Sequence, residues 1–186
     1  MSPPRFFDAV VLLAGASDPD LPELQTWVDR LASRFERGET PTLICTGCCH
    51  QSLDIFPGRT EAQITRDLLI DRGIPSSNIL CEELSGDLIG RIVHTCQQIL
   101  MPCGWYHIEL ILPGATRREE AWLIEAFGSD FDLSIAKETL QSTDTLQADN
   151  AALGEALARI GHPTSLTDLS SRMAEPKARG RPNPQA

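Results

Sequence analysis

The sequence predicts an α/β fold in which a parallel sheet lies between two layers of helices. Short apolar runs and amphipathic segments alternate five times along the chain. The first run, Val10–Ala14, is apolar without interruption, which is typical of a strand buried on both faces. Because crossovers between successive parallel strands are right-handed, five such units give a five-stranded parallel sheet with helices on both faces. This arrangement is a Rossmann-like three-layer sandwich.

Five strands are expected, with the first one at the centre of the sheet. It covers Asp8–Ala14, and Gly15 ends it with a small-residue turn. The later strands are shorter apolar runs bounded by turn residues, at Thr42–Thr46, Asn78–Glu82, His107–Leu112 and Phe131–Ala136.

Each strand is followed by a helical pattern with start and stop signals. In the first helix Asp20 can act as the N-cap and Gly38 is the stop, and in the second Thr60 can cap and Gly73 is the stop. The remaining helices are expected at Leu88–Leu100 (broken by Pro102 and Gly104), Thr116–Gly128 (with a capping box of Thr116 and Glu119) and Thr145–Ile160 (stopped by Gly161).

Length and charge limit the possible functions. The 186 residues suit one domain, residues 1–174, in which 164–174 add a helical turn; the basic, proline-rich tail 175–186 is expected to be disordered. The net charge of -10 disfavours nucleic acid and anionic membranes as partners. No apolar run approaches the roughly 20 residues that span a bilayer. The first residues lack the apolar core of a signal peptide, so a cytoplasmic location is expected.

The six cysteines are expected to be free thiols, because no secretory signal accompanies them. The run from Cys45 to His50 suggests a metal site at first sight. Zinc, however, usually takes four ligands from two separated pairs, and no second pair is present. Cys45 is therefore expected in the core, Cys48 or Cys49 is a candidate reactive thiol, and no metal is expected.

Four loops meet at the carboxyl edge of the predicted sheet, where α/β proteins bind their ligands. Their glycines and hydroxyls suit a phosphate or a ribose, but the fold requires such turn residues in any case, and no complete GxGxxG or P-loop is present. The small candidate ligand-binding residues are Gly15, Ala16, Ser17, Thr46, Gly47 and Gly114.

Charged residues at the same edge are the other candidates. Glu82 can hold a ribose diol or a cationic group, and Arg117 and Arg118 can bind a phosphate or carboxylate. Arg118 and Glu119 can alternatively be solvated charges. Ser85 and Asp87 follow the third strand, where either can also serve as a helix N-cap.

The order of these residues resembles the YdcF-like family, which includes the SanA and ElyC proteins. The resemblance is carried by DAVVLLAGA, PTLICTG, the helix opened by Glu61-Ala62 and followed by Gly73-Ile74-Pro75, and E-x-x-S-x-D at Glu82, Ser85 and Asp87. It covers roughly residues 8–128 and implies a Rossmann-like fold. One bacterial member is associated with S-adenosylmethionine, and others are linked to envelope integrity.

Several positions differ from the family pattern. Cys48 stands at the second glycine of Ser-Gly-Gly, and Thr46 at its serine. The remaining departures are Leu88, Gly90 and Arg91 in place of Thr, Glu and Asn, Arg117 in place of a His, and Glu120-Ala121 in place of an Arg-Ala pair.

The expected function is binding of a small nucleotide-like ligand, with S-adenosylmethionine as the candidate that the resemblance supplies. If the protein is an enzyme, Glu61 and Asp87 are the expected acid, base or ligand anchor. Glu61 opens a helix, where the helix dipole also favours a carboxylate for purely structural reasons. The alternatives are a non-catalytic interaction protein on the same scaffold, and a hydrolase or transferase acting on phosphorylated or lipid-linked sugars.

Overall fold

The computed structural model describes residues 7–13, 22–39, 41–48, 58–112, 117–136, 160–161 and 165–174. Five strands in these residues form a parallel sheet in the order β3-β2-β1-β4-β5. The strands are β1 (Ala9–Leu12), β2 (Leu43–Thr46), β3 (Ile79–Glu82), β4 (His107–Ile111) and β5 (Asp132–Ile135).

The predicted fold class is confirmed. Each expected strand is present, and β1 lies at the centre, paired in parallel with β2 on one side and β4 on the other. All four residues of β1 are buried, as its uninterrupted apolar run indicates. The chain order moves outward from β1 through β2 to β3 and then returns to β4, so the strand order reverses at β1.

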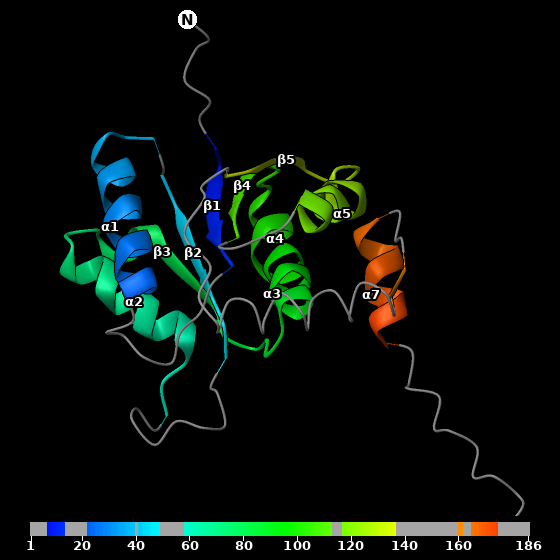
Figure 1. Ribbon diagram of the computed structural model, residues 1–186, viewed down its shortest axis with the longest axis horizontal. Coiled ribbons are helices and arrows are strands. Elements are labelled where there is room, and N and C mark those ends of the chain that lie inside the picture. Colours follow the sequence, from blue (N-terminus) through cyan, green and yellow to red (C-terminus); the bar gives the residue numbers. More distant parts are fainter. Residues whose placement is uncertain are drawn as a thin grey trace, which may run out of the picture.

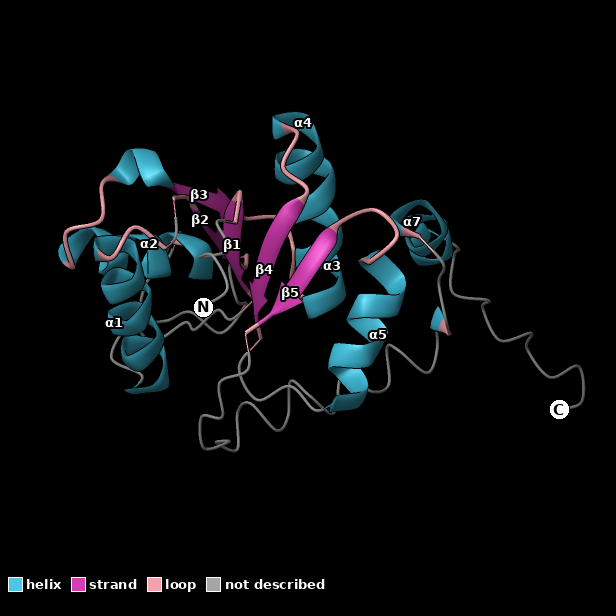
Figure 2. Cartoon of the chain, turned by 90° about the horizontal axis from the view of Figure 1, so that it is seen from above, coloured by secondary structure: helices cyan, strands magenta, loops and turns pink. Residues whose placement is uncertain are grey.

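Helices cover both faces of the sheet (Figures 1 and 2). On one face, α1 (Pro22–Glu36) and α2 (Glu61–Asp71) pack on Val10 and Leu12 of β1. On the other face, α3 (Leu88–Thr95) and α5 (Arg117–Phe127) belong to the core that contains Val11, and α7 (Leu166–Ala174) packs against α5 at the margin of that core. Successive β1 side chains point to opposite faces, so one strand supplies both halves of the core. Within the described residues, no helix has the length and apolar character of a membrane span.

Two helix starts agree with the sequence. Thr60 is the N-cap of α2, and Gln63 completes a capping box with it. Asp87 is the N-cap of α3, where its side chain accepts a hydrogen bond of 2.8 Å from the Gly90 amide. The second helix also stops as expected at Gly73, whose φ of +89° a side chain would rarely adopt.

The expectation that Pro102 breaks the third helix was wrong. A π-helical turn, Cys96–Leu100, follows α3, and the helix then continues as α4 (Met101–Cys103) until Gly104, with φ +68°, ends it. The Met101 amide donates to the carbonyl of Cys96, five residues earlier. A proline normally clashes with the carbonyl four residues before it, and the wider π turn relieves that contact.

Residues 164–174 form more than the expected turn, because α7 has nine residues and buries Leu166 and Leu169. Other predictions lie outside the described residues: the positions of Asp20, Gly15, Ala16, Ser17, Cys49 and Gly114, the capping box of Thr116 and Glu119, the helix 145–159, and the tail 175–186.

Candidate functional site

The carboxyl ends of β2 and β3 bring the predicted polar residues together. Thr46 and Glu82 are register partners at the last positions of the two strands. The loops beyond them stay in contact: the Gly47 amide donates to the Glu82 carbonyl at 2.9 Å, and the Cys48 amide to the Ser85 carbonyl at 3.0 Å. Two segments 36 residues apart in sequence therefore leave the sheet as one paired unit.

A buried ion pair lies against these loops. Glu61, the first residue of α2, is 3% exposed, and its Oε2 lies 2.6 Å from Nη2 of Arg91 on α3. The Arg91 side chain is itself only 13% exposed. The helix N-terminus favours the carboxylate, and Arg91 supplies the compensating charge that a buried carboxylate needs.

Gly47 makes room for this pair. A Cβ at Gly47 would lie 2.6 Å from Oε2 and 2.9 Å from Cβ of Glu61, and 3.4 Å from Cζ of Arg91. The φ of Gly47 is also +128°, a conformation that residues with side chains rarely adopt. The glycine is thus required here for space as well as for backbone geometry.

Glu82 is the most deeply buried acidic side chain of the site, with a side-chain exposure of 0%. Its Oε1 accepts hydrogen bonds of 2.9 Å from the Leu84 amide and from the Ser85 hydroxyl. Nδ1 of His94, on α3, lies 3.9 Å from the same oxygen. Glu82 Oε2 has no hydrogen-bond partner in the described part of the chain, and the same holds for Nε of Arg91.

We call Glu61, Glu82, Ser85 and Arg91 the edge cluster. It holds two carboxyl groups, one hydroxyl and one guanidinium. An acceptor on Glu82 and a donor on Arg91 are left without partners among the described residues. Native proteins pair nearly all of their buried polar groups, so two exceptions in one cluster call for an explanation.

Two other predicted residues have structural roles. Thr46 is fully buried, and its hydroxyl donates to the Leu12 carbonyl at 2.9 Å, which ties β2 to β1. Asp87 caps α3, one of the two roles that the sequence allows it.

Arg117 and Arg118, predicted to share the rim with Glu82 and Ser85, are separate from this cluster. Arg117 and Arg118 are exposed on the first turn of α5, which follows β4. β4 lies across β1 from β2 and β3. The exposure of Arg118 fits the solvated alternative.

Arg91 is the functional candidate that the sequence analysis did not select. It appeared only as a departure from the family pattern. Its position in the sequence could have identified it. Arg91 lies four residues after the N-cap Asp87, so the two residues are on the same side of α3. A long cation there can reach back to an acidic residue at the sheet edge.

The cysteines of the described residues are free thiols. Cys45 is fully buried in the core, as predicted, and burial raises its pKa well above the usual value. Burial also raises the pKa of Cys81 to about 11 and that of Cys96 to about 12. These thiols are protonated at neutral pH, so they are poor nucleophiles there.

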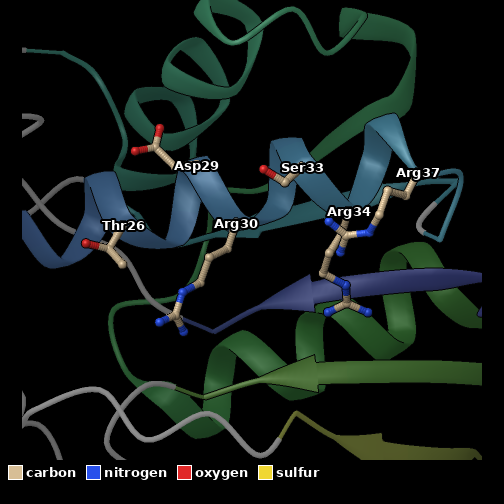
Figure 3. Close-up of a pocket in the computed structure, with 6 residues that line it drawn as sticks. All are labelled: Thr26, Asp29, Arg30, Ser33, Arg34 and Arg37. Atoms are coloured by element: carbon tan, nitrogen blue, oxygen red, sulfur yellow. The ribbon is translucent and has the colours of Figure 1, made fainter.

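A separate groove of about 380 Å³ runs along α1 (Figure 3). Its arginines are engaged within the chain: Arg34 Nη2 lies 2.5 Å from Glu109 Oε2, and Arg37 Nε lies 2.6 Å from Glu39 Oε1. Arg30 lies over the Trp27 ring at 5.4 Å. The groove is lined by Thr26, Asp29, Arg30, Ser33, Arg34 and Arg37.

Comparison with known proteins gives little to add to this geometry. No family model matches the chain, and no curated protein matches it. Among solved structures, the chain is similar to a putative hydrolase of the isochorismatase family from Chromobacterium violaceum, with 13% sequence identity and a TM-score of 0.40. The match covers 93% of this chain and 99% of that one.

Proposed function

We infer that this chain is a YdcF-like protein that binds a small nucleotide-like ligand at the carboxyl edge of its sheet. S-adenosylmethionine is the candidate ligand, and it comes from the family resemblance alone. The observation that carries the proposal is the edge cluster, in which charged side chains from α2, β3 and α3 are buried together. This is the edge at which open α/β sheets bind ligands.

The energetics of burial support a binding role over a purely structural one. Replacing a buried ion pair by apolar residues of similar volume is often neutral or stabilising, so such pairs are weak evidence for stability. The Glu82 oxygen that has no partner in the described part of the chain adds a further desolvation penalty. A ribose diol or a cationic group bonded to this oxygen would remove the penalty, which favours a ligand bearing one of them.

A binding function is better supported than an enzymatic one in which Glu61 or Asp87 acts as the acid or base. Glu61 Oε2 is bonded to Arg91, and Asp87 Oδ1 is bonded to the Gly90 amide. A general base needs a lone pair directed at the substrate. Because both groups are engaged by the protein itself, we assign Glu61 to holding Arg91 in place and Asp87 to capping α3.

We place the protein in the cytoplasm. The support is the state of the five cysteines in the described residues, which are all free thiols. Reducing compartments favour this state, whereas secreted proteins oxidise suitable pairs.

A thermal-shift screen of the full chain tests the proposal. The panel is S-adenosylmethionine, S-adenosylhomocysteine, nucleotides and sugar phosphates. A ligand at 100 times its Kd stabilises by about 2.7 kcal/mol, which raises the Tm of a protein of this size by about 5–11 °C. A Tm unchanged by every compound would refute the proposal and would favour the interaction protein instead.

Two variants locate the binding. Glu82→Gln keeps the side-chain size but removes the charge, and it should weaken binding about 10–100-fold because bonds to charged groups contribute about 1.5–3 kcal/mol. Glu36→Gln makes the same chemical change on an exposed residue at the end of α1, at the opposite edge of the sheet. It should leave the ligand-induced shift unchanged. Equal shifts in both variants would exclude Glu82 from the site.

A further inference from the structure

Two cysteines are neighbours on β2 and β3, next to the residues that end these strands at the edge cluster. Cys45 on β2 and Cys81 on β3 are register partners, one position before Thr46 and Glu82. Their side chains point to the same face of the sheet, where Cys45 belongs to the core under α1 and α2 and Cys81 packs against it. The Cys81 thiol lies 3.7 Å from the carbonyl of Ala62 on α2.

The spacing of neighbouring strands allows a disulfide between register partners, at the cost of some strain. Adjacent strands lie about 4.8 Å apart, and the Cα atoms of disulfide-bonded cysteines are usually about 4.4–6.8 Å apart. In a parallel pair the Cα–Cβ bonds of register partners point the same way, so the Cβ atoms start at a similar separation. That separation is slightly longer than the usual Cβ spacing of about 3.5–4.5 Å, so closing the bond draws the strands together.

We propose that Cys45 and Cys81 form a reversible cross-strand disulfide when the protein meets a peroxide. The inference does not depend on the proposed ligand. The resulting bond is strained by the strand spacing, and strained disulfides are readily reduced. It is therefore a reversible modification and not a structural cross-link.

The disulfide forms in two steps, with hydrogen peroxide as the oxidant. Cys81 is partly exposed, so its thiolate attacks hydrogen peroxide, the O–O bond breaks, and a sulfenic acid and water form. The Cys45 thiolate then attacks the Cys81 sulfur, the S–S bond forms, and the S–O bond breaks to release a second water. In sum, two thiols and one peroxide give one disulfide and two waters. Because burial raises the pKa of both thiols, the reaction is slow at neutral pH and faster in alkaline solution.

Peptide mapping of the intact chain tests this inference. The protein is treated with hydrogen peroxide at pH 9, denatured in an alkylating agent and digested without reductant. The expected product is a peptide pair joined through Cys45 and Cys81, two hydrogens lighter than the free thiols and separated by dithiothreitol. Exposed Cys103 reports that the oxidant was active, and buried Cys96 should be recovered alkylated.

The Cys45→Ser variant tests the role of Cys45 as the resolving thiol. In Cys45→Ser the resolving thiol is missing, so the sulfenic acid on Cys81 should persist and react with dimedone. In the wild type that label should be absent from Cys81. Recovery of alkylated Cys45 and Cys81 from wild-type protein in which Cys103 is oxidised would overturn the inference, as would a disulfide that joins either cysteine to a different partner.

Discussion

Removing Arg91 should destabilise the protein strongly, because it leaves the Glu61 carboxylate buried without its positive partner. Arg91→Met is the appropriate change, since methionine keeps the length and apolar character of the arginine stem. The Glu61 side chain is 5% exposed and that of Arg91 is 13% exposed, so solvent can compensate little of the lost interaction.

The expected loss is about 3 kcal/mol of unfolding free energy. Breaking a buried pair by removing one partner costs about 3–5 kcal/mol. The lower end applies here because Arg91 keeps some contact with solvent and the α2 N-terminus still favours the carboxylate. For a chain of this size, the change corresponds to a fall in Tm of about 6–12 °C.

The assay is urea denaturation followed by circular dichroism, on Arg91→Met, Glu61→Gln and the double variant. Groups in direct contact have coupling energies of about 0.5–3 kcal/mol, so the double variant should lose clearly less than the sum of the single losses. The control is Arg37→Met. Its ion pair with Glu39 has the same 2.6 Å separation but is exposed, so its loss should leave the denaturation midpoint unchanged.

Two results would refute this reasoning. One is an Arg91→Met variant as stable as Arg37→Met. The other is a cycle in which the losses from Arg91→Met and Glu61→Gln add. Either would mean that the 2.6 Å contact between the two side chains contributes little and that the edge cluster is not held together by charge.

Three further predictions concern the same edge of the sheet and the thiols near it. Gly47→Ala should lower the free energy of unfolding more than Gly73→Ala. Both glycines have positive φ, so each substitution adds about 1–3 kcal/mol of backbone strain, but only at Gly47 would the new Cβ lie 2.6 Å from a carboxylate oxygen. Equal urea midpoints for the two variants would contradict the steric role of Gly47. Asp87→Ala should lower the free energy of unfolding by about 1 kcal/mol, because the α3 N-cap is lost, whereas Asp87→Asn should lower it much less. An Asn variant as unstable as the Ala variant would show that Asp87 does not act as the cap. Burial raises the folded pKa of Cys81 to about 11 and of Cys96 to about 12, so above about pH 8.5 the unfolded chain loses these protons first. Stability measured in urea should therefore fall between about pH 8.5 and about 11, and a constant midpoint over that range would contradict the burial of these thiols.

The fold could be predicted because its signals are local. The apolar run that begins at Val10 indicates by composition alone a strand buried on both faces, and β1 is buried throughout. Thr60 and Gly73 delimit α2 by their own conformational preferences. The continuation past Pro102 could not be predicted, because it depends on a π turn that widens the helix over the preceding residues. The helix-breaking tendency of proline alone does not predict such a π turn.

The candidate site could be predicted only in part. The topology of parallel strands brings Glu61, Glu82 and Ser85 to one edge, and sequence order is enough to infer that. The pairing of Glu61 with Arg91 depends on the side-chain directions of two helices on opposite faces of the sheet, which no sequence spacing encodes. The role of Thr46 could not be predicted either. A threonine hydroxyl that binds a ligand and one that donates to a neighbouring strand have the same sequence signature.

The most direct test of the central claim is a nitrogen–proton NMR titration of the labelled chain with S-adenosylmethionine. The proposed site contains three amides whose hydrogen bonds report on it: Gly47 to the Glu82 carbonyl, Leu84 to Glu82 Oε1, and Gly90 to Asp87 Oδ1. We predict saturable shifts concentrated at these three amides, with none at the α1 amides of Arg30 and Ser33. Shifts confined to the α1 groove, or no saturable shift in any amide, would contradict a ligand site at the carboxyl ends of β2 and β3.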